Sequence, residues 1–472
     1  MEAVQRLPML SFARKTSPEP TSFGPKLKQY IRDFYHEDPE SYSNEIHTLE
    51  RLRAAAVCAV KDFSGVSTLT RYYCQLHFLQ SKFPMFKDGA AAVSFTWRDV
   101  YGSMVHTIAD IRYEILCILY NMGALHTQLG ALDTRVSADG IKMSCAHFQY
   151  AAGAFEHLKD RFPQPAGVDL AADIMQFMYY LSLAQAQECV LEKSMMDNRR
   201  PIVTAKVAVQ LVDYYRSALN TITQGGADNS SIPETVGSKI YENWKRYVKF
   251  KLVYHTCISL LYHGQQAEEQ QKMGERVTFY QAAAEKLEEA VRLSKGMDNI
   301  EAINGALTFT YEVVEGKKRA AKNENEIMYR EEVPPFDILS EVKGAPLVKG
   351  IMFNVSDPEI AGSDIFARLM PIKAHEVSSL SSEAEVKLLR KVGTVIDEDD
   401  KELSVLMTSL QLDYLKQPSE PESLSQEATT STHSVLSGGT STSNEKMMIT
   451  QQTEADRSDH AIYEAMDFSM SN

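Results

Sequence analysis

The sequence predicts a mainly α-helical protein in which long helices stack as a solenoid, with a small β element near the N-terminus. Seven consecutive segments carry apolar residues three or four positions apart, which is the period of a helix with one buried face. Short breaks rich in Pro, Gly, Asp and Asn separate these segments, so neighbouring helices are expected to pack antiparallel. The predicted helices are Ala109–Leu132, Asp139–Phe162, Asp169–Met196, Pro201–Thr223, Gly237–Gln271, Met273–Lys295 and Ile300–Tyr329.

An internal similarity supports the solenoid. Phe148–Phe155 and Tyr280–Leu287 share a pattern in which an aromatic residue is followed by small residues and then by a large apolar one. Small side chains at adjacent positions let two helices approach closely, as in the second helix of a tetratricopeptide unit. Asn121–Ala124 resembles the first helix of such a unit. Together with the consecutive helices, these two matches favour a tetratricopeptide-like core.

The first hundred residues are mixed in character. Two short apolar segments rich in β-favouring residues, Leu7–Phe12 and Ala92–Trp97, are expected to form the β element. Between them we expect three helices, at Pro25–Tyr35, Pro39–Val57 and Leu69–Lys82.

The helical period stops after Tyr329. Residues 333–358 are rich in proline but also in large apolar residues, which predicts an ordered strap lying over the helices. Glu383–Leu412 has the pattern of a further amphipathic helix, broken by the acidic run Asp397–Asp400. From Pro418 onward Ser, Thr, Gln and acidic residues dominate, and we expect a disordered tail.

Composition narrows the class of protein. The chain has 472 residues and a net charge of −14, of which the residues from Glu376 onward carry −11. The remainder is nearly neutral, which gives no argument for nucleic-acid binding. Six cysteines lie far apart, which argues against disulfides and zinc and for a reducing, cytoplasmic location. The sequence shows no secretory signal and no stretch approaching the ~18 apolar residues of a membrane span, so membrane contact is expected to be peripheral at most.

No catalytic or cofactor motif is found. The sequence lacks a glycine-rich phosphate loop, a His-Glu-x-x-His zinc motif, a nucleophile elbow and a phosphatase loop. His106, His126, His147 and His157 fall in adjacent helices, where interhelical hydrogen bonding is the simpler explanation than a metal. Basic and aromatic residues alternate over Tyr241–Lys251, a pattern that can bind single-stranded nucleic acid. Here the aromatic residues recur at helical spacing, so we expect them in the core and the cations in water. The chain is therefore expected to be no enzyme and to need no cofactor.

Three strings carry a resemblance to a known family. Leu116–His126, Ala184–Cys189 and Lys343–Lys349 resemble signatures of the Bro-one domain, the module of Alix-like ESCRT adaptors. Leu191–Met195 and Gln265–Gln271 are most similar to members that also carry a tyrosine phosphatase domain. The resemblance covers roughly residues 1–415. It divides the chain into a Bro-one domain (1–375), the start of a V-domain-like helix (376–415) and the tail (416–472), without the phosphatase domain.

The resemblance implies a fold and a partner. The fold is a boomerang-shaped domain with a tetratricopeptide-like core, whose concave apolar groove binds the C-terminal amphipathic helix of an ESCRT-III subunit. Such a protein is cytoplasmic, is recruited to endosomes, and supports cargo sorting into multivesicular bodies, with ESCRT-0 components as further possible partners. The family's contact positions correspond here to Val190, Val203 and Val207, with Ala146 and Leu347 bordering the groove. Tyr329 occupies the place of a tyrosine that some relatives expose for phosphorylation.

Alternatives remain open at this point. Val203 and Val207 lie four residues apart on one helix face, which by itself is more typical of core packing than of a partner surface. Valines also bury less apolar area than the larger residues usual in the family, which would lower affinity. At Tyr329 the flanking residues differ from those of the relatives, so a packed tyrosine is the alternative to a phosphosite. A general tetratricopeptide-like signalling or chaperone adaptor, binding another peptide, is the alternative function.

Overall fold

The computed structural model describes residues 6–164, 167–224, 232–340 and 342–409 and divides them into two compact units. The first unit contains the described residues up to 365 except residues 81–83. The second contains residues 81–83 and the described residues from 366 onward. The predicted disordered tail, residues 416–472, lies outside the described residues.

Three helices open the first unit: α1 (Gly24–Tyr30), α2 (Ser43–Val57) and α3 (Phe63–Lys82). A π-helical turn, Ile31–Tyr35, extends α1, and a 3-10 turn, Pro39–Tyr42, precedes α2, so the first two predictions are confirmed. The third helix begins six residues before the predicted Leu69. The reason is a cap at Asp62, whose carboxylate accepts hydrogen bonds from the Gly65 amide and the Ser64 hydroxyl.

The β element differs from the prediction. It consists of β1 (Phe95–Arg98) paired antiparallel with β2 (Val105–Ile108). Leu7–Phe12 forms no strand. The Leu10 amide and carbonyl bond to the side chain of Gln185, and the Phe12 amide donates to Thr127 Oγ1. Helix side chains therefore take the backbone bonds that a neighbouring strand would otherwise take.

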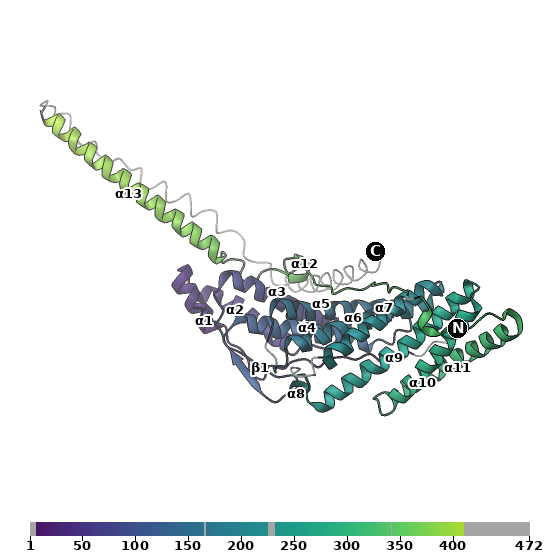
Figure 1. Cartoon of the computed structure of the whole chain (residues 1–472). Coiled ribbons are helices and arrows are strands. Elements are labelled where there is room, and N and C mark those ends of the chain that lie inside the picture. Colours follow the sequence, from purple (N-terminus) through teal and green to yellow (C-terminus); the bar gives the residue numbers. More distant parts are fainter. Residues whose placement is uncertain (1–5, 165–166, 225–231, 341, 410–472) are drawn as a thin grey trace, which may run out of the picture. The chain divides into compact units, whose positions relative to one another are not determined.

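The seven long helices are confirmed, with ends within a few residues of those predicted. Each packs on the next in chain order, as expected for a solenoid (Figure 1). A short helix, α8 (Ile232–Val236), precedes the fifth of them and was not predicted. The long helices are α4 (Ile111–Leu132), α5 (Ala138–Arg161), α6 (Ala172–Met196), α7 (Pro201–Gln224), α9 (Ser238–Glu269), α10 (Met273–Ser294) and α11 (Ile300–Glu324).

The helix α4 lies in the core. Gly123 and Gly130 face Phe155 and Phe148 of α5, and an added Cβ would lie 2.9 and 3.0 Å from those rings. Small residues thus allow the close helix approach that the repeated aromatic pattern predicted. Among the described residues, α4 is also long and apolar enough to cross a membrane by length and composition alone. The expectation that no segment reaches this threshold was therefore wrong, although most of the helix is buried inside the protein.

The strap is confirmed as an ordered segment. Residues 333–357, apart from residue 341, run over the helices with little secondary structure of their own. The strap's first part meets α10, where Thr278 Oγ1 donates to the Pro334 carbonyl. Further along, the Ala345 amide donates to the Lys206 carbonyl of α7, and the Ile351 amide donates to the Gln149 carbonyl of α5. The short helix α12 (Pro358–Ala361) follows the strap.

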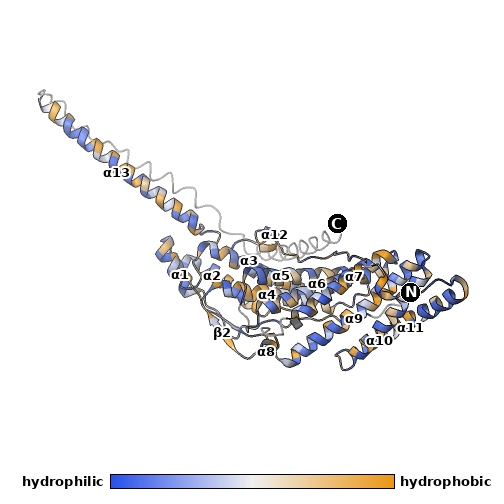
Figure 2. Cartoon of the chain, in the orientation of Figure 1, coloured by the Kyte–Doolittle hydropathy of each residue, from blue (hydrophilic) through white to orange (hydrophobic). Residues whose placement is uncertain are grey.

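The second unit consists largely of α13 (Ile372–Ser409). The helix begins eleven residues before the predicted Glu383, ahead of the predicted domain boundary at 375. The acidic run Asp397–Asp400 lies inside the helix and does not break it. No residue of α13 is buried, and polar and apolar residues alternate along its whole length (Figure 2).

Candidate partner-binding surface

The predicted contact residues come from α5, α6, α7 and the strap, and they differ widely in exposure. Val203 of α7 is 38% exposed and Leu347 of the strap 58% exposed. Val190 of α6 is partly buried. Val207 and Ala146 are almost fully buried. The accessible apolar surface therefore consists of Val203, Leu347 and part of Val190, whereas Val207 and Ala146 pack beneath it.

One buried side chain connects the parts of this surface. The Gln187 amide of α6 donates to the Val207 carbonyl (3.2 Å) and to the Ala345 carbonyl (3.0 Å). Its Oε1 accepts from the Leu347 amide at 3.3 Å. The same side chain therefore bonds to α7 and to the strap on both sides of Pro346. This arrangement fixes Leu347 on α6, through the same side chain that bonds to the Val207 carbonyl of α7.

The strap has an inner and an outer side here. Successive side chains of an extended segment point in opposite directions, so Val348 turns inward where Leu347 turns outward. Val348 joins a buried cluster with residues of α5 and α6, and Val190, Met196 and Tyr214 pack partly buried against it. The remaining cluster members are Ile141, Cys145, Phe148, Ala152, Leu183, Ala186 and Cys189. Leu347 is thus presented to solvent on a rigid base.

Cations surround the apolar residues. Arg199 and Arg200 immediately precede α7, and Lys206 lies on its first turns; all three are exposed. Lys343 and Lys349 are exposed on the strap, on either side of Leu347. Arg199 also lies 3.7 Å from Asp197. The surface therefore combines an apolar centre with a basic border.

A buried ionic network lies between α6, α7 and α9. Lys251 Nζ lies 2.6 Å from Glu188 Oε1, and the Tyr215 hydroxyl donates to Glu188 Oε2 at 2.5 Å. Burial favours a high pKa for Glu188, but attraction to Lys251 and His255 prevails and lowers it. Every member is buried, so the network is structural. It also corrects the expectation that the cations of Tyr241–Lys251 all face water, since Lys251 is buried against Glu188, whereas Arg246 and Lys249 are exposed.

Two of the four histidines, His126 of α4 and His147 of α5, form a hydrogen bond, whereas His106 lies on β2 and not on a helix as predicted. His126 Nδ1 lies 2.8 Å from His147 Nδ1, and both rings are buried. Burial lowers the pKa of His147 to about 4, so this pair is neutral near pH 7. Across the described residues no three potential metal ligands gather. The structure thus favours the interhelical hydrogen bond predicted for this pair.

Tyr329 is exposed rather than packed. It ends a π-helical turn, Asn325–Tyr329, that continues α11. Its neighbours Ile327 and Met328 are also exposed. The structure therefore contradicts the alternative in which the Tyr329 side chain is packed in the protein interior.

The sequence of residues 9–389 matches the BRO1-like domain family. The chain belongs to this family. BRO1-like domains are non-catalytic scaffolds of ESCRT adaptors.

Several proteins of this family are similar to the chain. Human tyrosine-protein phosphatase non-receptor type 23 is 45% identical over 413 residues, which are 88% of the chain and 25% of that protein. Vacuolar protein-sorting protein BRO1 of Gibberella zeae is 30% identical over 430 residues, 87% of the chain and 42% of that protein. The chain thus spans about a quarter of the phosphatase and less than half of the sorting protein.

Solved structures give the same fold. The ALIX BRO1 domain in complex with CHMP4C matches with a TM-score of 0.67 and 26% identity, over 77% of the chain and all of that domain. ALIX bound to a viral late-domain peptide matches with a TM-score of 0.72, over 86% of the chain and 57% of that protein. At 23% identity, this similarity supports a shared fold and nothing about a shared partner.

Two features of the surface were not predicted from the sequence. One is Gln187, which stands in the string Ala184-Gln185-Ala186-Gln187 within a largely buried helix. A glutamine inside such a helix has to find a buried partner, and this signal could have indicated it. The other is the basic border, of which Arg199-Arg200 directly before a helix-starting proline was the visible part.

Proposed function

We propose that the chain is a BRO1-like ESCRT adaptor that binds the C-terminal amphipathic helix of an ESCRT-III subunit across α7 and the strap. The observation that carries the proposal is the surface formed by Val203, Leu347 and Val190, on which two exposed apolar residues lie within a basic border. The structural similarity to the ALIX BRO1 domain, which was solved with CHMP4C, supports this choice of partner.

The proposed mode is a helix lying in an apolar groove. Apolar side chains three and four residues apart on the partner would cover Val203 and Leu347. Acidic residues on the flanks of the partner helix would meet Arg199, Arg200, Lys206, Lys343 and Lys349. Because the strap is already ordered by Gln187, binding would cost little ordering entropy on this side. The small valine at position 203 leaves most of the apolar contact to Leu347 and the partner.

The proposed cellular role follows from this partner. Binding an ESCRT-III subunit would recruit that subunit during cargo sorting into multivesicular bodies at endosomes, with ESCRT-0 components as further partners. Membrane contact would be peripheral. We also propose the division into a BRO1-like domain (1–375), a V-domain-like helix (376–415) and a tail (416–472). Tyr329 is proposed as a phosphorylation site because it is exposed.

A general peptide adaptor is the competing function, and the basic border is the observation that favours it. Cations near a solenoid surface also suit the acidic tail of an unrelated peptide. The two proposed functions differ in whether the apolar residues at the centre of the surface contribute to binding. An ESCRT-III helix needs the contacts of Val203 and Leu347, whereas an acidic tail needs only the cations.

Val203→Asp tests the proposal. A peptide of the CHMP4C C-terminal helix is titrated into the full chain, and binding is followed by fluorescence anisotropy. An unpaired carboxylate in an apolar contact should weaken binding at least tenfold, or about 1.4 kcal/mol. Val291→Asp is the matched control, since Val291 on α10 is 39% exposed, close to the 38% of Val203. A scrambled peptide of the same charge should not bind.

Three outcomes would contradict the proposal. The affinity of the Val203→Asp variant could equal that of the wild type. The scrambled peptide could bind as well as the native one, which would favour the general adaptor. The variant could also lose helicity by circular dichroism, which would assign Val203 to the core.

A further inference from the structure

The helix α13 carries a long apolar stripe that no described residue covers. Its 38 residues include none that is buried. The main apolar side chains of the stripe are between 48% and 67% exposed: Val377, Leu380, Leu388, Val392, Val395, Leu403 and Leu406. An exposed apolar surface of this length is typical of an interface.

The stripe keeps to one face of the helix. Its members, with Ala384 among them, follow one another at steps of three or four residues, interrupted only where Asp399 stands in the stripe. Ala384, Val395 and Leu406 recur every eleven residues, a period of about 3.67 residues per turn. This period is close to that of a straight α-helix, so two such helices can remain in contact over many turns.

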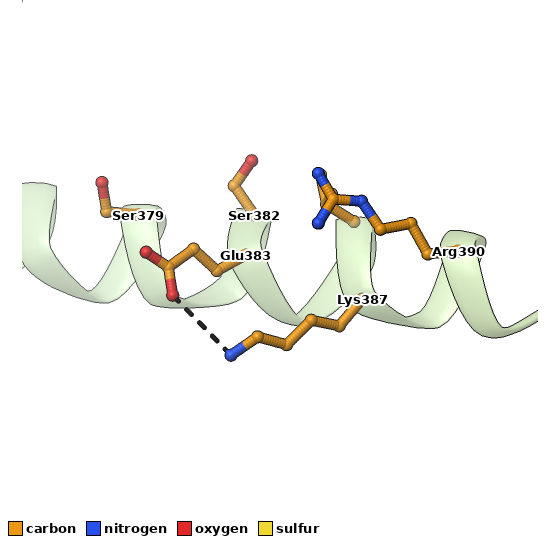
Figure 3. A pocket seen from close by; sticks show the side chains of 6 residues that line it. Ser379, Ser382, Glu383, Lys387 and Arg390 are labelled. Atoms are coloured by element: carbon orange, nitrogen blue, oxygen red, sulfur yellow. Dashed lines mark ion pairs between the residues drawn. The ribbon is translucent and has the colours of Figure 1, made fainter.

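The side of α13 away from the stripe is mostly polar: a hollow there is lined by Ser379, Ser382, Glu383, Val386, Lys387 and Arg390 (Figure 3). The shallow hollow there is lined by residues of α13 alone, and Glu383 lies 4.0 Å from Lys387 within it. This face offers no apolar contact surface comparable to the stripe. A partner of α13 would therefore lie along the stripe.

Charges along one edge of the stripe indicate what that partner is. Lys387 and Lys391 precede the middle of the helix, and Glu398 and Glu402 follow it at the mirror-image spacing. All four are exposed. In a parallel second copy this edge would lie against the opposite edge of the partner helix, so these lysines and glutamates would not meet one another. An antiparallel second copy would place Lys387 opposite Glu402 and Lys391 opposite Glu398, which is attractive at both pairs.

We propose that α13 associates with α13 of a second copy of this chain as an antiparallel helix pair. In the register that pairs these charges, Val392 packs against Val395 and Ala384 against Leu403. Asp399 then faces Leu388 and lies within reach of Lys391 of the other copy. A charged residue at a core position disfavours other registers, which helps to select this one. The inference does not depend on the proposed ESCRT-III partner.

Sedimentation equilibrium of the full chain tests the association. The wild type should be a concentration-dependent dimer, and Leu388→Glu with Val395→Glu should make it a monomer. Val386→Glu is the control, because Val386 is an exposed valine on the polar face. A wild type that remains monomeric at 100 µM (about the upper range of a weak specific complex) would overturn the proposal. So would a dimer that persists in the double variant.

Charge exchange tests the orientation. Lys387→Glu with Lys391→Glu should weaken self-association at least tenfold. Adding Glu398→Lys and Glu402→Lys should restore it, because both pairs become attractive again in the antiparallel arrangement. This four-residue variant should pair with itself and not with the wild type. A four-residue variant that associates with the wild type as strongly as with itself would show that these charge pairs do not form and would contradict the proposal.

Discussion

Two glutamines of α6 hold extended segments on different sides of the helix. Gln185 bonds to the Leu10 amide and carbonyl, and Gln187 bonds to Ala345, Leu347 and the Val207 carbonyl. Residues two apart on a helix differ by about 200° in direction, so these side chains point to opposite sides. Each primary amide supplies both a donor and an acceptor, as a backbone peptide does. Both glutamines are completely buried, which makes their hydrogen bonds costly to lose.

Gln187→Leu should therefore weaken partner binding and stability together. The substitution removes the partner of the Ala345 carbonyl and of the Leu347 amide, at a cost of about 2 kcal/mol or more in the free energy of unfolding. Leu347 would also lose its fixed position on α6. Urea unfolding and peptide titration measure the two effects.

Gln185→Leu is the matched control for this prediction. It should lower stability to a similar extent but leave peptide affinity within twofold, because it affects the N-terminal segment. Equal losses of affinity in both variants would show that the strap's position is not what Gln187 contributes to binding.

The spacing of apolar residues did not show which members of the predicted site are exposed and which are buried. Val203 and Val207 have the same spacing signature, yet Val207 is buried and Val203 is exposed. Lys251 is a similar case, because its partner Glu188 lies 63 residues earlier in the chain. Exposure depends on contacts with residues distant in sequence, and a local pattern does not contain them.

The strap passes very close to α5 at Gly153. An added Cβ at this position would overlap the carbonyl oxygen of Ile351, and Gly350 of the strap also lies against Gly153. The Ile351 amide donates to the neighbouring Gln149 carbonyl at 3.0 Å. The strap can therefore lie on α5 only because residue 153 is a glycine and has no Cβ.

Gly153→Ala should displace the strap and expose α5, even though alanine favours helix formation. The free energy of unfolding should fall by about 1–3 kcal/mol, and hydrogen exchange of the amides of Lys349 and Ile351 should accelerate. Gly316→Ala on α11 provides the comparison, since nothing lies within 4 Å of an added Cβ there. That substitution should stabilise the protein by up to about 1 kcal/mol. Unchanged exchange in the Gly153→Ala variant would contradict this account of the strap.

Helices were predicted well and extended segments were not. The apolar period and the turn residues are local, so the bounds of α4 to α7 follow from the sequence within a few residues. Leu7–Phe12 has the composition of a strand but bonds to Gln185 and Thr127, which only the tertiary structure places beside it. In α13 the run Asp397–Asp400 suggested a break, but exposed acidic side chains remain solvated on the helix and do not end it.

Within the first unit, a stack of long helices carries extended segments on its surface, and the proposed partner surface lies where the strap crosses α7. Val348 and the buried cluster hold the strap from below, and Gln187 holds it from the side. The scaffold is therefore ordered before a partner arrives. The central claim of this account is that a partner helix contacts the strap at Leu347.

Site-specific photo-crosslinking tests this claim most directly. A photoreactive phenylalanine derivative is placed at position 347 or, as the control, at position 338, and the CHMP4C helix peptide is added. Ile338 lies on the same strap and is 69% exposed against 58% for Leu347, so exposure alone would favour crosslinking at position 338. The account predicts a crosslink to the peptide from position 347 and none from position 338. A peptide that binds but crosslinks only at position 338, or at neither position, would contradict it.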